Sequence, residues 1–178
     1  MTLREEFIAL TDFFKGENLD YAIVGAFALY AYGYTRATRD VDFITRREYQ
    51  GKIIRHLESR GFETLNCSEG FSTHVHSVDE VRIDLIYVSG ETADIIFGST
   101  KDMPIFENVR HPVVSPEHLI ALKLFAIHNE PGRKYKEFAD IKEIFKHTSI
   151  DKDDIREYFT KYNLEEYFDE ISGEENSG

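Results

Sequence analysis

Three aspartates in this 178-residue chain are placed where they could bind metal ions together. Asp40 and Asp42 flank the apolar Val41, and Asp84 lies inside the apolar segment Val81–Tyr87. Alternate side chains of a β-strand share one face, so Asp40 and Asp42 should project together while Val41 points into a core. Two such carboxylates, with a third on a neighbouring strand, are what a pair of Mg²⁺ or Mn²⁺ ions needs to hold a triphosphate. An unpaired buried acid is costly unless its face opens on a ligand, which favours a metal site over a solvated strand face for Asp84.

Transfer of a nucleoside monophosphate from an NTP would use all three acids. The reaction needs an activated acceptor hydroxyl, in-line attack on the α-phosphorus and neutralised pyrophosphate, and two metal ions about 3.5–4 Å apart meet these needs. Asp40 and Asp42 would bridge the metals, and Asp84 would bind the ion that activates the acceptor and could take its proton. The positive side chains expected to meet the phosphates are Arg36, Arg39 and Lys123. Lys123 could instead reach solvent from an apolar helix, and Arg39 could pair with a nearby acid.

The elements upstream of Asp40 should position the phosphates. Tyr21–Val24 has the composition of a short buried strand, and Gly25 then opens an apolar helix from Phe27 to about Tyr32. The small residues Gly25 and Ala26 let a phosphate approach the backbone N–H groups at the start of this helix.

The remaining pattern up to residue 114 mixes helices and strands. Apolar residues at spacings of three and four predict helices over Leu3–Phe14, Arg46–Arg60 and Ala93–Phe97. Strands are predicted over Phe62–Leu65, Phe71–His76, Val81–Tyr87 and Val109–Val114, the second and third forming a hairpin. His74 and His76 alternate on one of these strands and are expected on a solvated face, because no cysteine or histidine cluster supports zinc.

Residues 115–171 have a helical character. Ser115 can cap a helix with Pro116 in its first turn, and apolar stripes recur to Ile171. The predicted fold class is therefore α+β, with a mixed sheet flanked by helices. The predicted organisation is a catalytic domain over 1–114, a helical region over 115–171 and a disordered tail over 172–178.

The amino-acid composition disfavours some classes of binding partner. The formal net charge of −12 disfavours binding to long duplex nucleic acid, because phosphate backbones attract lysine and arginine. The single cysteine, Cys67, suits a reducing cytoplasm and is not expected to be a nucleophile. No apolar stretch approaches the roughly 20 residues of a membrane-spanning helix, and no secretory signal is recognised, so no membrane partner is expected.

The order of these motifs resembles a known superfamily. Val24-Gly25-Ala26, a spacer, and Asp40-Val41-Asp42-Phe43 resemble the signature of the nucleotidyltransferase superfamily typified by DNA polymerase beta. That signature is a hydrophobic residue, Gly-Gly or Gly-Ser, a spacer, and alternating acids. Thr38–Phe43 most resembles the minimal bacterial AbiEii-like group, and segments 119–124 and 133–141 are similar to its C-terminal helical pattern. Ala26 stands where the superfamily usually has Gly or Ser, so it has no hydroxyl for a triphosphate oxygen.

The resemblance implies an enzyme that binds ATP or another NTP and transfers its nucleotide to an acceptor. It further implies a role in a toxin–antitoxin system, with tRNA or a protein as the acceptor. A transferase that modifies a small hydroxylated antibiotic is an alternative. A catalytically degenerate module that holds a nucleotide or a protein without turnover is another, consistent with Ala26.

Overall fold

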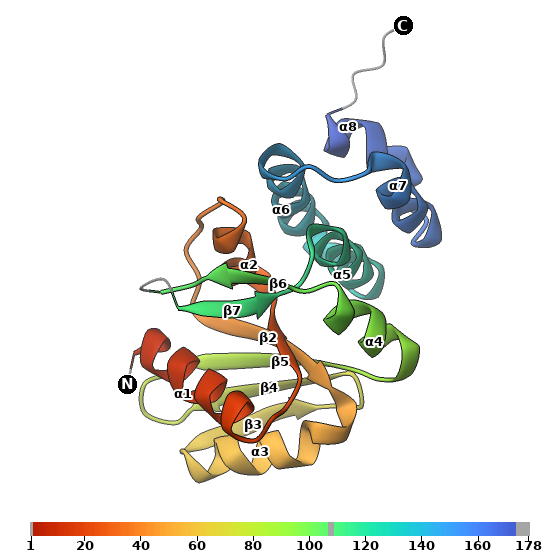
Figure 1. Ribbon diagram of the computed structural model, residues 1–178. Helices are drawn as coiled ribbons and strands as arrows, with labels where there is room; N and C mark the ends of the chain where they lie inside the picture. Colours follow the sequence, from red (N-terminus) through yellow and green to blue (C-terminus); the bar gives the residue numbers. More distant parts are fainter. Residues whose placement is uncertain (1, 107–108, 174–178) are drawn as a thin grey trace, which may run out of the picture. The chain divides into compact units, whose positions relative to one another are not determined.

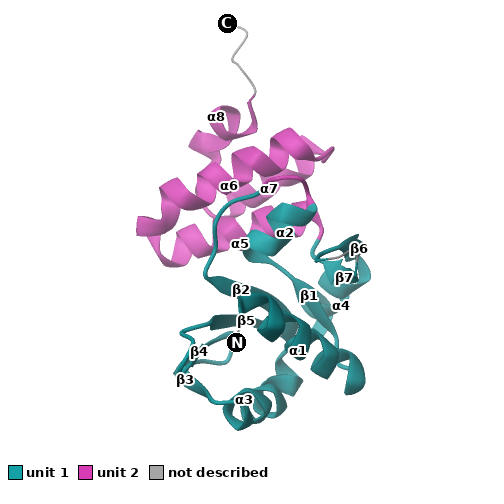
Figure 2. Ribbon diagram, turned by 90° about the vertical axis from the view of Figure 1, so that its left-hand side faces the viewer, with its two compact units in different colours: residues 1–31, 35–114 teal, residues 32–34, 115–178 magenta. Residues whose placement is uncertain are grey.

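The computed structural model describes residues 2–106 and 109–173, which fall into two compact units. The first unit comprises residues 1–31 and 35–114, and the second comprises residues 32–34 and 115–178 (Figure 2). The first contains the sheet, and the second is built from helices (Figure 1). The expected tail over 172–178 lies outside the described residues from 174 onward, and Ser172 ends a helix.

The strands of the described residues form one mixed sheet in the order β3-β4-β5-β2-β1-β7-β6. β2 pairs with β5 in parallel and with β1 antiparallel, and β7 is parallel to β1. This arrangement confirms the predicted α+β class with a mixed sheet. The strands are β1 Tyr21–Ile23, β2 Asp40–Arg46, β3 Phe62–Cys67, β4 Phe71–His76, β5 Arg82–Val88, β6 Lys101–Pro104 and β7 Arg110–Val113.

Helix α1 (Leu3–Gly16) packs on the apolar face of β2. Thr2 and Glu5 form a capping box at its start, and Phe7 inside it is fully buried. The Phe7 ring lies 5.6 Å from that of Phe43 on β2 and 5.0 Å from that of His111 on β7. The other helices of this unit are α2 Gly25–Ala31, α3 Gln50–Ser59 and α4 Gly90–Gly98.

Some predicted elements differ from the structure. The helix expected from residue 46 begins at Gln50 after a 3₁₀ turn over Arg47–Tyr49, because β2 continues pairing with β5 as far as Arg46. β6 was not predicted, since its sequence of mostly exposed side chains has no apolar alternation. The expectation of solvated histidines is wrong, because His74 pairs across the sheet with the buried Ile83 and is itself buried.

The second unit packs its helices around an aliphatic and aromatic core. Ser115 caps α5 by accepting from the His118 N–H, and Pro116 occupies the first turn, as predicted. No helix among the described residues is both long and apolar enough to cross a bilayer. The helices of the second unit are α5 Pro116–Asn129, α6 Lys134–His147, α7 Lys152–Lys161 and α8 Phe168–Ser172, with 3₁₀ turns at Pro131–Arg133 and Glu165–Tyr167.

The buried His111 should make the first unit sensitive to acid. Its Nδ1 lies 3.1 Å from the Tyr21 hydroxyl, and burial, aided by Lys15, lowers its pKa to about 4. An unfolded histidine titrates near pH 6.5. Below that pH the histidine of the unfolded chain is protonated, whereas His111 in the folded chain stays neutral. The stability associated with neutral His111 is therefore fully present above about pH 6.5 and is lost as the pH falls towards 4.

We predict that His111→Gln flattens the pH dependence of unfolding in this window, by up to about 1.4 kcal/mol per pH unit. Urea unfolding at a series of pH values measures the slope. The exposed His128, replaced in His128→Gln, is the control and should leave the slope as in the wild type. A His111→Gln slope equal to the wild-type slope would contradict the assignment.

Candidate metal-binding active site

The three predicted acids meet on one face of the sheet. Asp42 on β2 is in register with Asp84 on β5, and Asp40 precedes Asp42 by two residues. One carboxylate oxygen from each of the three lies within 4.8 Å of the others. Asp84 is buried, whereas Asp40 and Asp42 are half-buried. The strands thus bring together carboxylates that are up to 44 residues apart in the sequence, from Asp40 to Asp84.

Gly25 lies against the Asp42 carboxylate. Its φ of +63° is in the left-handed region, and a Cβ built on it would lie 2.0 Å from Asp42 Oδ2. The preceding Val24 N–H donates to the Asp42 carbonyl oxygen at 3.1 Å. Both the backbone conformation and the close approach therefore require glycine. Ala26 follows as a buried residue in α2.

Two further side chains hold the acids in place. The Thr38 hydroxyl donates to Asp40 Oδ1 and to the Asp40 carbonyl oxygen, the latter at 3.2 Å. Arg82 contacts both oxygens of Asp84, with Nε 3.0 Å from each and Nη2 2.9 Å from Oδ2. Sequence reasoning missed both residues. Arg82 could have been found from strand alternation, since residues 82 and 84 share a face.

Thr73 on β4 extends the polar row beyond Asp84. It is the cross-strand partner of Asp84 in the antiparallel β4–β5 pair, and directly opposite side chains lie on the same face. The residue is 2% exposed, and its hydroxyl has no hydrogen-bond partner among the described residues. A buried hydroxyl without a partner is costly. The Thr73 hydroxyl is therefore a polar group on the acid-bearing face that a bound molecule could satisfy.

The predicted phosphate-binding arginines lie in the segment before β2. Arg36 is half-buried and its Nη1 lies 3.4 Å from the Ala37 carbonyl oxygen, while Arg39 is exposed. Their contacts with phosphate stay predictions.

Lys123 has a different environment from the one expected of a phosphate ligand. It is buried in the second unit, where its Nζ donates to Glu137 Oε2 at 2.9 Å and to Asp140 Oδ2 at 2.6 Å. Arg133 adds a contact to Glu137 Oε1 at 2.7 Å. Burial raises the pKa of Glu137, but Lys123 and Arg133 outweigh burial and lower it. The predicted contact of Lys123 with phosphate stays a prediction.

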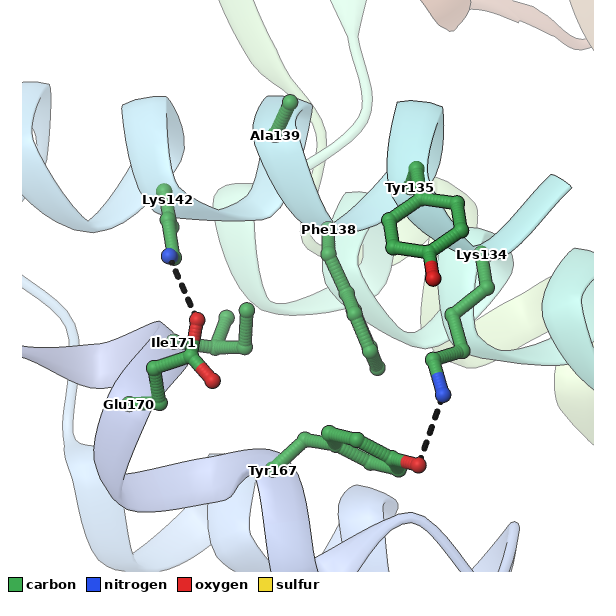
Figure 3. Close-up of a pocket in the computed structure, with 8 residues that line it drawn as sticks. All are labelled: Lys134, Tyr135, Phe138, Ala139, Lys142, Tyr167, Glu170 and Ile171. Atoms are coloured by element: carbon green, nitrogen blue, oxygen red, sulfur yellow. Dashed lines mark hydrogen bonds and ion pairs between the residues drawn. The ribbon is translucent and has the colours of Figure 1, made fainter.

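The second unit also contains a surface pocket of about 300 Å³ between α6 and α8 (Figure 3). Lys134 Nζ lies 2.6 Å from the Tyr167 hydroxyl, and Lys142 Nζ lies 3.0 Å from Glu170 Oε1. Both cations are thus engaged by residues of the pocket itself. None of the predicted site residues lines this pocket.

The donor set of the acid cluster fits a hard divalent cation. Mg²⁺ and Mn²⁺ prefer carboxylate oxygens, and the cluster offers one from each of Asp40, Asp42 and Asp84. No cysteine or histidine belongs to the cluster, which makes it unlike a zinc site. The arrangement can therefore hold a cation beside the Gly25 backbone, where a nucleotide phosphate could approach.

We predict that Gly25→Ala both destabilises the first unit and displaces Asp42. A left-handed φ costs a non-glycine residue about 1–3 kcal/mol, and the added Cβ would overlap the Asp42 carboxylate. Chemical denaturation and Mn²⁺ titration measure the two effects. Gly98→Ala is the matched control, because a Cβ there meets nothing within 4 Å and the backbone is unstrained. An unperturbed Mn²⁺ affinity in folded Gly25→Ala would contradict the close approach.

Replacing Lys123 should act first on stability. Lys123→Ala leaves Glu137 and Asp140 buried without their shared cation, which typically costs about 3–5 kcal/mol. Lys142→Ala removes a pair whose side chains are 38% and 72% exposed, and should cost less than about 1 kcal/mol. Thermal and urea unfolding distinguish the two variants. Equal stability in both would show that the buried pair contributes little.

Comparison with solved structures found proteins of similar fold. ANT(2″)-Ia in complex with adenylyl-2″-tobramycin superposes with a TM-score of 0.69 at 16% identity, covering 91% of this chain and 98% of that one. The lincosamide antibiotic adenylyltransferase LnuA, bound to lincomycin, gives a TM-score of 0.56 at 14% identity, covering 81% and 97%. A nucleotidyltransferase-like antigenic protein from Paracoccidioides brasiliensis gives 0.61 at 16% identity, covering 96% and 90%. At these identities the likeness establishes a shared fold.

A comparison with curated protein sequences found no match. The family model described as "Nucleotidyl transferase AbiEii toxin, Type IV TA system" matches residues 9–176. This match spans nearly the whole chain, including the glycine turn, the acid cluster and the helical unit, and the predicted superfamily is thereby confirmed. The chain belongs to the AbiEii nucleotidyltransferase family.

Proposed function

We propose that this protein is a Mg²⁺- or Mn²⁺-dependent nucleotidyltransferase that moves a nucleoside monophosphate from an NTP to an acceptor hydroxyl. The observation that carries the proposal is the convergence of Asp40, Asp42 and Asp84 within 4.8 Å. Membership of the AbiEii family and the shared fold support the same class of reaction.

The chain's own residues divide the work as follows. Asp40 and Asp42 would hold the cations that accompany the triphosphate, and Thr38 orients Asp40 through its hydroxyl. The backbone at Gly25 and Ala26 lies beside Asp42 and offers the phosphates a close approach. When bound, the divalent cations would polarise the α-phosphate and lower the pKa of the acceptor hydroxyl. Arg36, Arg39 and Lys123 remain the proposed cationic contacts of the phosphates.

The proposed transfer forms one bond, breaks one bond and moves one proton. The acceptor oxygen forms a bond to the α-phosphorus, and the bridging bond between the α- and β-phosphates breaks, so pyrophosphate leaves. The hydroxyl proton passes to the Asp84 carboxylate, which has an oxygen within 4.8 Å of carboxylate oxygens of Asp40 and Asp42.

For the acceptor, we propose tRNA or a protein in a toxin–antitoxin system, and the family match favours this role. The second candidate is a small hydroxylated antibiotic. It is favoured by the fold shared with the proteins bound to lincomycin and to adenylyl-2″-tobramycin. Either acceptor requires the same acid cluster.

Asp42→Asn and Asp84→Asn should fail in different ways. Asp42→Asn should lose most of the rise in melting temperature that NTP and Mg²⁺ give the wild type, because a ligand stabilises only a protein that binds it. Asp84→Asn should keep much of that rise but release pyrophosphate at least about 100-fold more slowly, because it loses the proton acceptor. The exposed Asp94, which pairs with Arg46, supplies the control Asp94→Asn.

The assay combines each α-labelled NTP with total tRNA, lysate protein or an aminoglycoside, and follows label transfer together with pyrophosphate release. Label on one class of acceptor identifies it. Stabilisation by NTP without pyrophosphate release in the presence of any of these acceptors would indicate a binding module instead. Wild-type turnover in Asp84→Asn would remove Asp84 from the mechanism.

A further inference from the structure

Arg82 occupies the carboxylate that the proposed reaction assigns to a metal ion. Its Nε lies 3.0 Å from both Asp84 oxygens, and Nη2 lies 2.9 Å from Oδ2. Two-point contact of a guanidinium with a carboxylate is among the strongest ion-pair geometries in proteins. Asp84 thus has a cationic partner before any divalent ion arrives.

Arg82 is placed so that its side chain can move away from Asp84. Arg82 pairs in register with Asp40 across the parallel β2–β5 ladder, so its side chain starts from the acid-bearing face. Its side chain is 48% exposed, whereas that of Asp84 is 11% exposed. The carboxylate is therefore fixed in the sheet, while the guanidinium has solvent into which it can turn.

Arg82 also offsets the repulsion among the acids. Its guanidinium pairs directly with the Asp84 carboxylate, and its backbone position is in register with Asp40 in the β2–β5 ladder. One guanidinium and one divalent cation cannot both take full two-point contact with a single carboxylate, and their like charges repel. Metal binding at Asp84 must therefore compete with Arg82.

We propose that Arg82 is a positioning residue that clamps Asp84 in the metal-free protein and releases it when a divalent cation binds there. The inference rests on the proposed function and adds an internal competitor to it. The clamp keeps the acids together without metal and lowers the affinity of Asp84 for its cation. The triphosphate supplies negative charge that can receive the released guanidinium, so nucleotide and this cation should bind with positive coupling.

Mn²⁺ binding to the full chain, measured by calorimetry and electron paramagnetic resonance, tests the clamp without requiring turnover. Arg82→Gln removes the guanidinium and should bind Mn²⁺ about tenfold more tightly than the wild type in the absence of nucleotide. Arg82→Lys keeps the positive charge but cannot bridge both oxygens, and should also bind more tightly. If the net charge alone mattered, Arg82→Lys would match the wild type.

Arg47→Gln and Arg47→Lys are the matched controls, because Arg47 is 44% exposed and pairs with Glu69 away from the acids. Both should bind Mn²⁺ like the wild type. Thermal unfolding without metal verifies that each variant is folded, and Arg82→Lys serves if Arg82→Gln is not.

The outcomes separate the clamp from the proposed function. Mn²⁺ binding that depends on Asp42 but is unchanged in both Arg82 variants would overturn the clamp and leave the transferase proposal standing. Weaker binding in both Arg82 variants would also overturn it, since Arg82 would then assist the metal. Failure of the wild type to bind Mn²⁺ with or without an NTP would remove the proposed function itself.

Discussion

Three carboxylates that repel one another are held within 4.8 Å by the parallel pairing of β2 with β5. Two unit charges about 4 Å apart repel by about 4 kcal/mol at an effective dielectric constant of about 20. The ladder withstands this repulsion because it runs unbroken from Asp40 with Arg82 to Arg46 with Val88. Arg82 then sets a positive charge directly against Asp84. The site thus depends on backbone pairing first and on local charge second.

The same pairing also fixes which face carries the acids. Val41 and Phe43 on β2 and Ile83 and Leu85 on β5 are fully buried on the opposite face. A shift of one residue in the register would bring the acids into that core and expose the apolar side chains. Burial of the apolar residues therefore specifies the geometry of the polar ones. This link explains how a site with unfavourable electrostatics persists in a stable sheet.

The helical unit contains a second group of charges with a different character. Lys123, Glu137 and Asp140 are almost completely buried, and Arg133 in the 3₁₀ turn before α6 pairs with Glu137. A buried ion pair adds little net stability compared with an apolar cluster, but removing one partner is costly. This cluster therefore links α5 to α6, because Lys123 on α5 contacts both acids on α6. Replacements of Lys123 must be interpreted with that structural role in mind.

The sequence by itself determined the fold class, the glycine turn, the capped helix after Ser115 and the identity of the three acids. These features depend on local periodicity, on capping chemistry and on acids at alternate strand positions, all of which can be recognised in short segments. The contacts and the burial of individual side chains could not be predicted in the same way. The position of Thr73 opposite Asp84, the burial of His74 and the ion cluster at Lys123 all depend on which strands or helices are neighbours. Only the tertiary structure decided them, because burial and pairing between distant segments are set by the packing of the whole unit and not by the composition of any one segment.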